Sequence, residues 1–334
     1  MALSKPDDSV IVQDTLDMAQ HYLVCGIKNC KKNCQFYCNL CHRPMCKRCR
    51  DEHRKSPETK HHEMVGYRQR KLKLPVDKCK DHPTKDLDML YVSGKRWVSD
   101  NIGNLVEIDL QGNQLQSFQA SVGSEGYHTM RQNGDLMYTD GDNKMIKKIN
   151  LHTNEIVEYI KTGDWKPLSI HCSHLNGDIL VGMNKDEEAK VTRYNKRGKE
   201  IQNIYRDNKG QKLYDYPYYI AENINGDICA SDYNKNTVVV VNKSGETKFS
   251  YTGQMAEFYP CGICTEGVGH ILVCDSINRT IHLLNKEGQF LSLLLSPQQS
   301  DKSPHSVCFD DENNLYVGEN KNNTITVYKI QQDV

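Results

Sequence analysis

Short segments of alternating apolar and polar residues recur along the chain from about residue 86 onward. Each segment follows a polar turn, and successive segments are separated by 39 to 49 residues. Period-two alternation over so short a stretch is typical of a β-strand, whereas helical repeats need a 3.6-residue period. A repeat of this length with three or four short strands predicts a propeller blade. The equivalent apolar positions are Trp97, Leu136, Ile179, Ile228, Ile271 and Leu315.

The fifth repeat shows the blade pattern most clearly, with strands expected over 260–264, 269–275, 280–284 and 290–295. Six such units fill the chain to its last residue, which predicts an all-β body. The sixth unit has only three strands, so a fourth must come from the N-terminal side to close the ring. We expect the segment 83–95 to supply that strand as well as the start of the first unit.

Cysteines change the picture for the N-terminal part. The chain has 14, and eight of them lie between Cys25 and Cys79. Acidic residues interrupt the first 24 positions, so we expect no signal peptide, and no apolar run approaches the roughly 20 residues of a membrane-spanning helix. We therefore expect a cytoplasmic protein in reducing conditions. Clustered cysteines in such a compartment indicate metal binding rather than disulfides.

Charge divides the chain in the same way. Residues 25–82 hold 16 Lys and Arg against 6 Asp and Glu, whereas residues 83–334 hold 26 against 33. A basic, cysteine-rich head therefore precedes a mildly acidic body, although the net charge of the whole chain is zero.

The candidate metal ligands of the head come in pairs. Two residues between thiols allow one tight turn to present both sulfurs to a tetrahedral ion. Eight thiolate and imidazole ligands would close two structural sites, and soft ligands of this kind favour Zn²⁺. Spacing alone leaves open whether consecutive or alternate pairs share an ion. The pairs are Cys25 with Cys30, Cys38 with Cys41, Cys46 with Cys49, and His53 with His61 or His62.

The pattern from Cys30 to His53, followed by His62-Glu63-Met64-Val65, resembles the B-box zinc finger of the tripartite-motif family. In that family alternate pairs share zinc in a cross-brace. The gap after Cys25 is wider than in the family, and Cys34, otherwise left unligated, is the alternative to Cys25 or Cys30. The resemblance implies one ion held by Cys25, Cys30, Cys46 and Cys49, and a second held by Cys38, Cys41, His53 and His62.

The fourth, fifth and sixth repeats of the body resemble NHL repeats, which form six-bladed propellers at the end of many tripartite-motif chains. Cys79 and His82 resemble the opening pair of a second B-box, but no further Cys or His follows up to residue 95. The resemblance therefore implies a small zinc-stabilised B-box followed by a six-bladed NHL-type β-propeller. The expected domains are a disordered segment 1–20, the B-box 21–66, a linker 67–85 with the remnant of a second B-box, and the propeller 86–334.

Catalytic motifs are missing from the sequence. It contains no G-x-S-x-G, no phosphate-binding loop and no H-E-x-x-H. Cys261 and Cys264 would face opposite sides of one strand, so we expect buried thiols rather than a metal site. The segment 140–143 is expected to form a hairpin turn rather than a calcium loop. The carboxylates that end second strands are expected to cap the following turns, at Asp100, Asp140, Asp232 and Asp275.

The resemblance implies work in the ubiquitin pathway, where a RING finger recruits the ubiquitin-carrying enzyme and the propeller selects the target. The first 24 residues contain no cysteine, and no heptad array precedes the first blade. We therefore predict a non-catalytic adaptor that binds protein partners through propeller and B-box. We expect neither a membrane nor a small-molecule substrate as a partner.

Two alternatives belong to other classes of function. An RNA-binding regulator would use a basic patch on the propeller, although the acidic body argues against it. A propeller hydrolase or lyase would need polar ligands on the central axis, for which His171, His305 and Asp310 are the candidates. The basic patch would consist of Lys144, Lys147, Lys148 and Lys166.

Overall fold

The chain forms two compact units, Met1–Tyr67 and Arg68–Val334. The computed structural model describes residues 25, 27, 30, 32, 35–38, 40–41, 43–66, 71–73, 87–92, 95–100, 103–109, 113–120, 127–295, 303–310, 314–319 and 324–329.

The first unit is a small three-stranded sheet beside one short helix. Strands β1 (Phe36–Cys38), β2 (Arg43–Met45) and β3 (Met64–Gly66) are antiparallel in the order β2-β1-β3, and helix α1 (Lys47–Lys55) follows β2. The last turn of the helix is basic, which suits the negative end of its dipole. Cysteines and one methionine supply most of the buried cluster, which is too small an apolar core to stabilise a domain alone.

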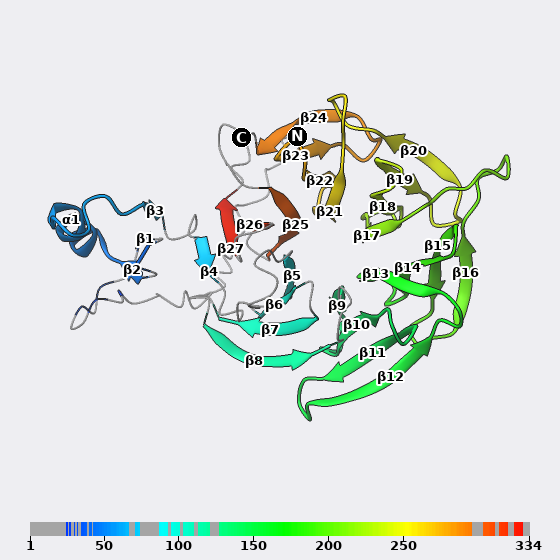
Figure 1. Cartoon of the computed structure of the whole chain (residues 1–334), viewed down its shortest axis with the longest axis horizontal. Helices are drawn as coiled ribbons and strands as arrows, with labels where there is room; N and C mark the ends of the chain where they lie inside the picture. Colours follow the sequence, from blue (N-terminus) through cyan, green and yellow to red (C-terminus); the bar gives the residue numbers. More distant parts are fainter. Residues whose placement is uncertain are drawn as a thin grey trace, which may run out of the picture. The chain divides into compact units, whose positions relative to one another are not determined.

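The second unit is a six-bladed β-propeller, as the repeat period predicts. Six four-stranded antiparallel sheets stand around a central axis (Figure 1). The innermost strands are β5 (Leu87–Val92), β9 (His128–Met130), β13 (Lys166–Cys172), β17 (Pro217–Glu222), β21 (Pro260–Thr265) and β25 (Pro304–Phe309). Each contacts the next, and β25 contacts β5, so the ring is closed.

The remaining strands run outward from the axis in sequence order in the first five blades. The first blade continues with β6 (Lys95–Asp100), β7 (Asn104–Ile108) and β8 (Gln114–Gln119), and the second with β10 (Leu136–Asp140), β11 (Met145–Asn150) and β12 (Glu155–Lys161). The third has β14 (Ile179–Lys185), β15 (Glu188–Tyr194) and β16 (Glu200–Ile204), and the fourth β18 (Ile228–Asp232), β19 (Thr237–Val241) and β20 (Thr247–Tyr251). The fifth has β22 (Ile271–Asp275), β23 (Thr280–Leu284) and β24 (Phe290–Leu295). The last has β26 (Asn314–Glu319) and β27 (Thr324–Lys329).

Burial explains why apolar and polar residues alternate clearly in some strands and hardly at all in others. Every residue of β18 and β19 is buried, because neighbouring blades cover both faces of a blade near the axis. Most residues of the outermost strand β20 are exposed, and more buried side chains alternate with exposed ones toward its end. The second and third strands therefore read as continuous apolar runs such as Val238–Val241, and the alternating pattern belongs mainly to the blade's outer edge.

The repeated Gly-Asp lead-in is a tight turn between the first and second strands of a blade. In the fourth blade Gly226 has φ of 80°, and its N–H donates to the Asn223 carbonyl at 2.8 Å. Asp227 returns the chain to the sheet, and its N–H donates to the Asn225 side chain at 3.1 Å. Glycine is favoured here because other residues adopt a positive φ only with strain.

Carboxylates at the ends of second strands cap the following turns. Asp232 accepts backbone N–H groups from Asp215 at 2.7 Å and from Lys235 at 3.0 Å. Asp140 accepts the Asn143 N–H at 3.1 Å, which also makes 140–143 a hairpin turn between β10 and β11. The side chain of Asp100 lies outside the described part of the structure.

The strand that closes the ring is not where the sequence analysis placed it. Strand β4 (Lys71–Lys73) pairs with β27, with Leu72 opposite Ile325, and completes the last blade. The expected segment 83–95 instead supplies β5, which pairs with β6 as the inner strand of the first blade. The expectation that 83–95 begins the first unit is therefore confirmed, whereas the expectation that it also closes the ring was wrong, because the three residues of β4 are too few for their pattern to predict a strand.

A close approach of two backbones leaves no room for a side chain at one glycine of the inner strands. A Cβ on Gly262 in β21 would lie 2.6 Å from both the His305 carbonyl oxygen and the Ser306 Cα of β25. We expect Gly262→Ala to lower the free energy of unfolding by about 1–3 kcal/mol, since the backbone must shift. Thermal or urea unfolding monitored by circular dichroism measures the change.

Gly267→Ala is the matched control, because nothing lies within 4 Å of a Cβ at that position. Its effect should stay within about 0.5 kcal/mol. Equal stability of the two variants would contradict the close approach of β21 and β25.

Candidate metal centre

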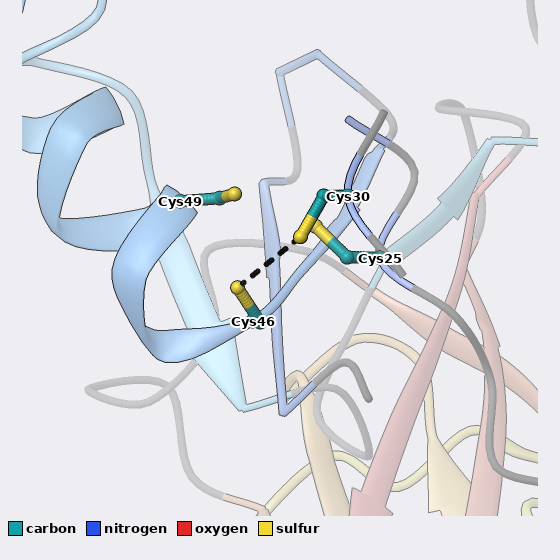
Figure 2. Close-up of side chains that lie close together, drawn as sticks. All are labelled: Cys25, Cys30, Cys46 and Cys49. Atoms are coloured by element: carbon teal, nitrogen blue, oxygen red, sulfur yellow. Dashed lines mark hydrogen bonds between the residues drawn. The ribbon is translucent and has the colours of Figure 1, made fainter. Parts of the chain in front are cut away.

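Four cysteines of the first unit gather around one point. Cys46 precedes α1 and Cys49 lies in its first turn, while Cys25 and Cys30 come from the segment before β1. Figure 2 shows the four sulfurs converging. The sulfurs all lie within 4.8 Å of one another, and those of Cys30 and Cys46 are 3.8 Å apart. A tetrahedral ion with sulfur bonds of ~2.3 Å requires sulfurs about 3.8 Å apart.

A second group combines two cysteines with two histidines. Cys38 ends β1 and Cys41 follows in the next turn, where its N–H donates to the Cys38 sulfur at 3.3 Å. The Cys41 sulfur lies 3.8 Å from His53 Nε2 and 3.2 Å from His62 Nδ1. The Cys38 sulfur is 3.7 Å from His62 Nδ1. These separations also fit one small tetrahedral ion.

Hydrogen bonds to the backbone help to position the ligands. Cys25 N–H donates to the Lys32 carbonyl at 2.8 Å, and Cys30 N–H to the Ile27 carbonyl at 3.0 Å, which forms a turn around the first pair. Thr59 Oγ1 donates to the carbonyl oxygen of His53 at 2.5 Å and ties the end of α1 to the loop that leads to His62.

Electrostatics in both groups favours a bound cation. A hydrogen bond from the Cys49 backbone lowers the pKa of the Cys46 thiol to about 7, so Cys46 is readily ionised. Burial and the neighbouring thiols raise the pKa of Cys49, and burial beside Cys38 raises that of Cys41. Burial and the nearby His62 lower the pKa of His53, which keeps its imidazole neutral. Adjacent thiolates repel one another, and a divalent ion removes this repulsion.

Each group could therefore hold one metal ion. The donor atoms are soft thiolates and neutral imidazoles in fours, which fits zinc. Four protein ligands fill a tetrahedral site and leave no open position for a catalytic water. Such an ion would cross-link the segments of the chain that carry its four ligands, which is a structural role.

The structure brings together the eight residues that the resemblance implies as ligands, in two groups of four. Cys25 and Cys30 lie with Cys46 and Cys49, so alternate pairs meet, a point that spacing alone left open. His62 rather than the exposed His61 lies in the second group. Cys34, Cys79 and His82 lie outside the described residues.

The propeller offers no third group of this kind among its described residues. His305 Nε2 lies 3.5 Å from the Tyr218 hydroxyl. Asp310 accepts the Asn314 N–H at 2.8 Å and the Tyr316 hydroxyl at 3.0 Å, which is a role in the turn. Of the three candidate axial ligands, His171 lines a cavity on the axis.

The lysines proposed as an RNA-binding patch are partly neutralised. Lys147 Nζ lies 2.7 Å from Asp140, and Lys148 Nζ lies 3.1 Å from Asp135. Cys261 and Cys264 belong to no metal-ligand group in the described structure, and burial raises the pKa of Cys264 far above its usual range.

Sequence reasoning missed two features of the propeller. One is a cluster of tyrosines on a single face, for which the run Tyr216-Pro217-Tyr218-Tyr219 is a visible signal. The other is a cavity on the axis that contains Glu222, for which the sequence offers no comparable signal.

Comparison with known proteins supports the propeller. The NHL repeat family model matches residues 302–328. No curated protein matches the sequence significantly. Among the described residues no helix is both long and apolar enough to cross a bilayer.

Several solved structures share the fold. A virginiamycin B lyase from Staphylococcus aureus, solved with quinupristin, is 19 % identical, with a TM-score of 0.56 over 76 % of this chain and 87 % of that one. A gluconolactonase from Xanthomonas campestris is 10 % identical, with a TM-score of 0.58 over 73 % and 86 %. A chain of a nidogen/laminin complex is 13 % identical, with a TM-score of 0.52 over 65 % and 81 %. At such low identity these likenesses establish the architecture alone.

Metal content should follow the two groups of ligands. We expect the purified chain to carry two zinc ions, Cys46→Ser to lose about one of them, and a strong chelator to unfold the first unit while the propeller remains folded. Elemental analysis by mass spectrometry and circular dichroism measure these effects.

Cys172→Ala is the control, because Cys172 is a buried propeller cysteine outside both groups. It should keep both ions. A wild-type chain without zinc, or equal zinc loss in both variants, would refute the assignment.

Proposed function

We propose that this chain is a zinc-binding, non-catalytic adaptor of the tripartite-motif type, in which the propeller selects a protein partner. The observation that carries the proposal is the combination of two units. One has a core built around two sets of candidate metal ligands, and the other is a propeller with an NHL repeat. We take both units to serve recognition.

Zinc is proposed to stabilise the first unit. The proposed ions are held by Cys25, Cys30, Cys46 and Cys49, and by Cys38, Cys41, His53 and His62. Ligation of this kind would replace the apolar core that the unit lacks, so its fold would depend on the metal. The rigid head would then present its basic surface to other subunits of a ligase assembly.

A cluster of tyrosines, here called the aromatic face, is the best candidate for partner binding. Tyr218 contacts Tyr216 and Tyr233 with ring centroids 5.8 and 5.7 Å apart, and Tyr233 contacts Tyr259 at 5.7 Å. Tyr233 is exposed, as are Met255 and Ile277 in neighbouring turns. Aromatic residues and methionine are enriched in protein interfaces, and tyrosine buries a large area at a small cost in conformational entropy.

The turns beneath the aromatic face are rigidly connected. The Asn278 side chain donates to the Glu257 carbonyl at 2.6 Å, which joins the turn between β22 and β23 to the loop before β21. Asp232 holds the backbone of Asp215 and Tyr216 below the same face. A preformed surface loses little conformational entropy on binding, which favours affinity.

RNA binding is the less well supported of the two proposed functions of this propeller. The ion pairs of Lys147 and Lys148 reduce the charge of the patch that would contact phosphates. The body as a whole carries more acidic than basic residues. We therefore assign the aromatic face to a protein, in the cytoplasm, and a role in substrate recognition for a ubiquitin ligase follows from the resemblance to tripartite-motif proteins.

The aromatic face gives a direct test of this function. In cells, the tagged chain should co-purify with a discrete polypeptide, and Tyr233→Ala combined with Tyr259→Ala should reduce its recovery by roughly 10-fold or more, as for interface hot spots. Quantitative mass spectrometry measures recovery. RNA cross-linked by ultraviolet light should stay at the level of a propeller-deleted control.

Leu115→Ala is the control, because Leu115 is an exposed apolar residue on β8 of another blade. It should leave recovery unchanged. RNA recovered well above the control would favour the RNA-binding alternative, and ubiquitin transfer by the purified chain with only activating and carrying enzymes would contradict a non-catalytic adaptor.

A further inference from the structure

The two ends of the propeller ring carry different side chains. The aromatic face lies at the end where the inner strands begin, because Tyr216 directly precedes β17 and Tyr259 directly precedes β21. The turns that follow β13, β17 and β21 lie at the opposite end. The turns between the third and fourth strands of the same blades lie at that end too, because neighbouring strands are antiparallel.

Three aliphatic side chains form a row across neighbouring blades at this opposite end. Leu175 follows β13, Ile224 follows β17 and Val268 follows β21, and all three are more than half exposed. Leu175 Cδ1 lies 3.7 Å from the position of a Cβ on Gly226, and Ile224 Cδ1 lies 3.5 Å from that of a Cβ on Gly269. Each of these two side chains therefore lies over a turn of the next blade, where a glycine leaves room for it.

Basic turns border this row in the third and fourth blades. The turn between β15 and β16 and the turn between β19 and β20 both have the sequence Asn-Lys-x-Gly. In the first of them the asparagine side chain accepts the N–H groups of Arg197 at 2.9 Å and Lys199 at 3.1 Å, which fixes the backbone. The lysines of the two turns, Lys196 and Lys243, are exposed.

The lysines begin directly beside the aliphatic row. A Cβ on Gly226 would lie 3.8 Å from Lys243 Cβ as well as 3.7 Å from Leu175 Cδ1, so these two side chains flank the same point. Lys196 Cβ lies 3.8 Å from the equivalent position on Gly177, two residues after Leu175. We call this surface the amphipathic face, and it consists of Leu175, Ile224, Val268, Lys196 and Lys243.

The first basic turn is anchored to the second blade. The Tyr159 hydroxyl donates to the Lys196 carbonyl at 2.8 Å, and Arg131 Nη2 donates to the same oxygen at 2.8 Å. A turn that is held in this way loses little conformational entropy when a partner binds to it.

The amphipathic face has an excess of positive charge. Two exposed carboxylates, Glu200 and Glu246, lie in or next to the basic turns, and each accepts a hydrogen bond from an asparagine side chain. Four exposed cations stand against these two carboxylates, and none of the four pairs with a carboxylate among the described residues. The four are Lys196, Arg197, Lys199 and Lys243.

We propose that the amphipathic face binds an acidic segment of a protein, whose carboxylates lie beside the basic turns while its apolar side chains cover the aliphatic row. Such a segment complements the excess positive charge and removes the exposed aliphatic side chains from water. The propeller would then bind proteins at both ends of its ring, which goes beyond the selection of one partner by the aromatic face.

The chemistry of the face favours a polypeptide over other polyanions. Single-stranded nucleic acids bind through aromatic side chains on which their bases stack, whereas this row is aliphatic. An anionic bilayer would be repelled by Glu200 and Glu246, whereas a peptide can place its carboxylates beside the lysines alone.

The test selects random dodecapeptides, displayed on phage, on the purified full-length chain. Synthetic copies of the recovered peptides are then titrated with the chain and followed by fluorescence anisotropy. We expect a group of peptides that combine Asp or Glu with Leu, Ile or Val. Lys196→Glu combined with Lys243→Glu should weaken their binding roughly tenfold or more, because repulsion replaces attraction.

Lys161→Glu combined with Lys209→Glu is the matched control, because it makes the same change of charge at the other end of the ring. Lys161 is an exposed residue that ends β12. Lys209 is exposed in a turn after β16 that is fixed in a similar way, since its N–H donates to the Asp207 side chain at 2.8 Å. This variant should bind the peptides as the wild type does.

Three results would overturn the proposal. One is that no recovered peptide depends on Lys196 and Lys243, and another is that the peptides that do so lack acidic residues. The third is that only oligouridylate, or only vesicles of phosphatidylcholine with phosphatidylserine, bind in a way that depends on these lysines. Tyr233→Ala combined with Tyr259→Ala should leave the binding of acidic peptides unchanged, so failure here is distinct from failure of the aromatic face.

Discussion

A propeller blade is stable only when both of its faces are covered, and this constraint governs most of the second unit. The inner three strands of a blade are apolar on both sides, as β18 and β19 illustrate, so a free blade would expose them to water. Neighbouring blades provide the cover, and the ring must close for the first and last blades to obtain it. The inner strands then approach one another so closely that Gly262 has no room for a side chain.

The two units obtain their stability from different interactions. The propeller buries a continuous apolar core that spans several blades. The first unit buries cysteines and a methionine, and we propose that metal bonds at its two ligand groups take the place of packing. Apolar burial weakens on cooling, whereas metal ligation weakens on acidification because thiolates and imidazoles take up protons. The units are therefore expected to respond to different stresses.

Features that arise from local chemistry could be predicted from the sequence, and features that depend on distant packing could not. The blade period follows from turns such as Gly226-Asp227, and the ligand candidates follow from short spacings such as Cys46 to Cys49. Strand β4 has only three residues, and only its distant partner β27 makes it a strand. The aliphatic row depends on the turn of the next blade that each side chain lies over, as Leu175 lies over Gly226, which no local pattern records.

The pairing of Leu72 with Ile325 has a consequence for synthesis on the ribosome. The strand that completes the last blade is made before the rest of the propeller, but its partner β27 follows about 250 residues later. Until then a nascent chain carries unpaired strand edges and uncovered blade faces, the features that promote aggregation. The ring therefore closes only after β27 has been made, and a chain that terminates before β27 cannot close it at all.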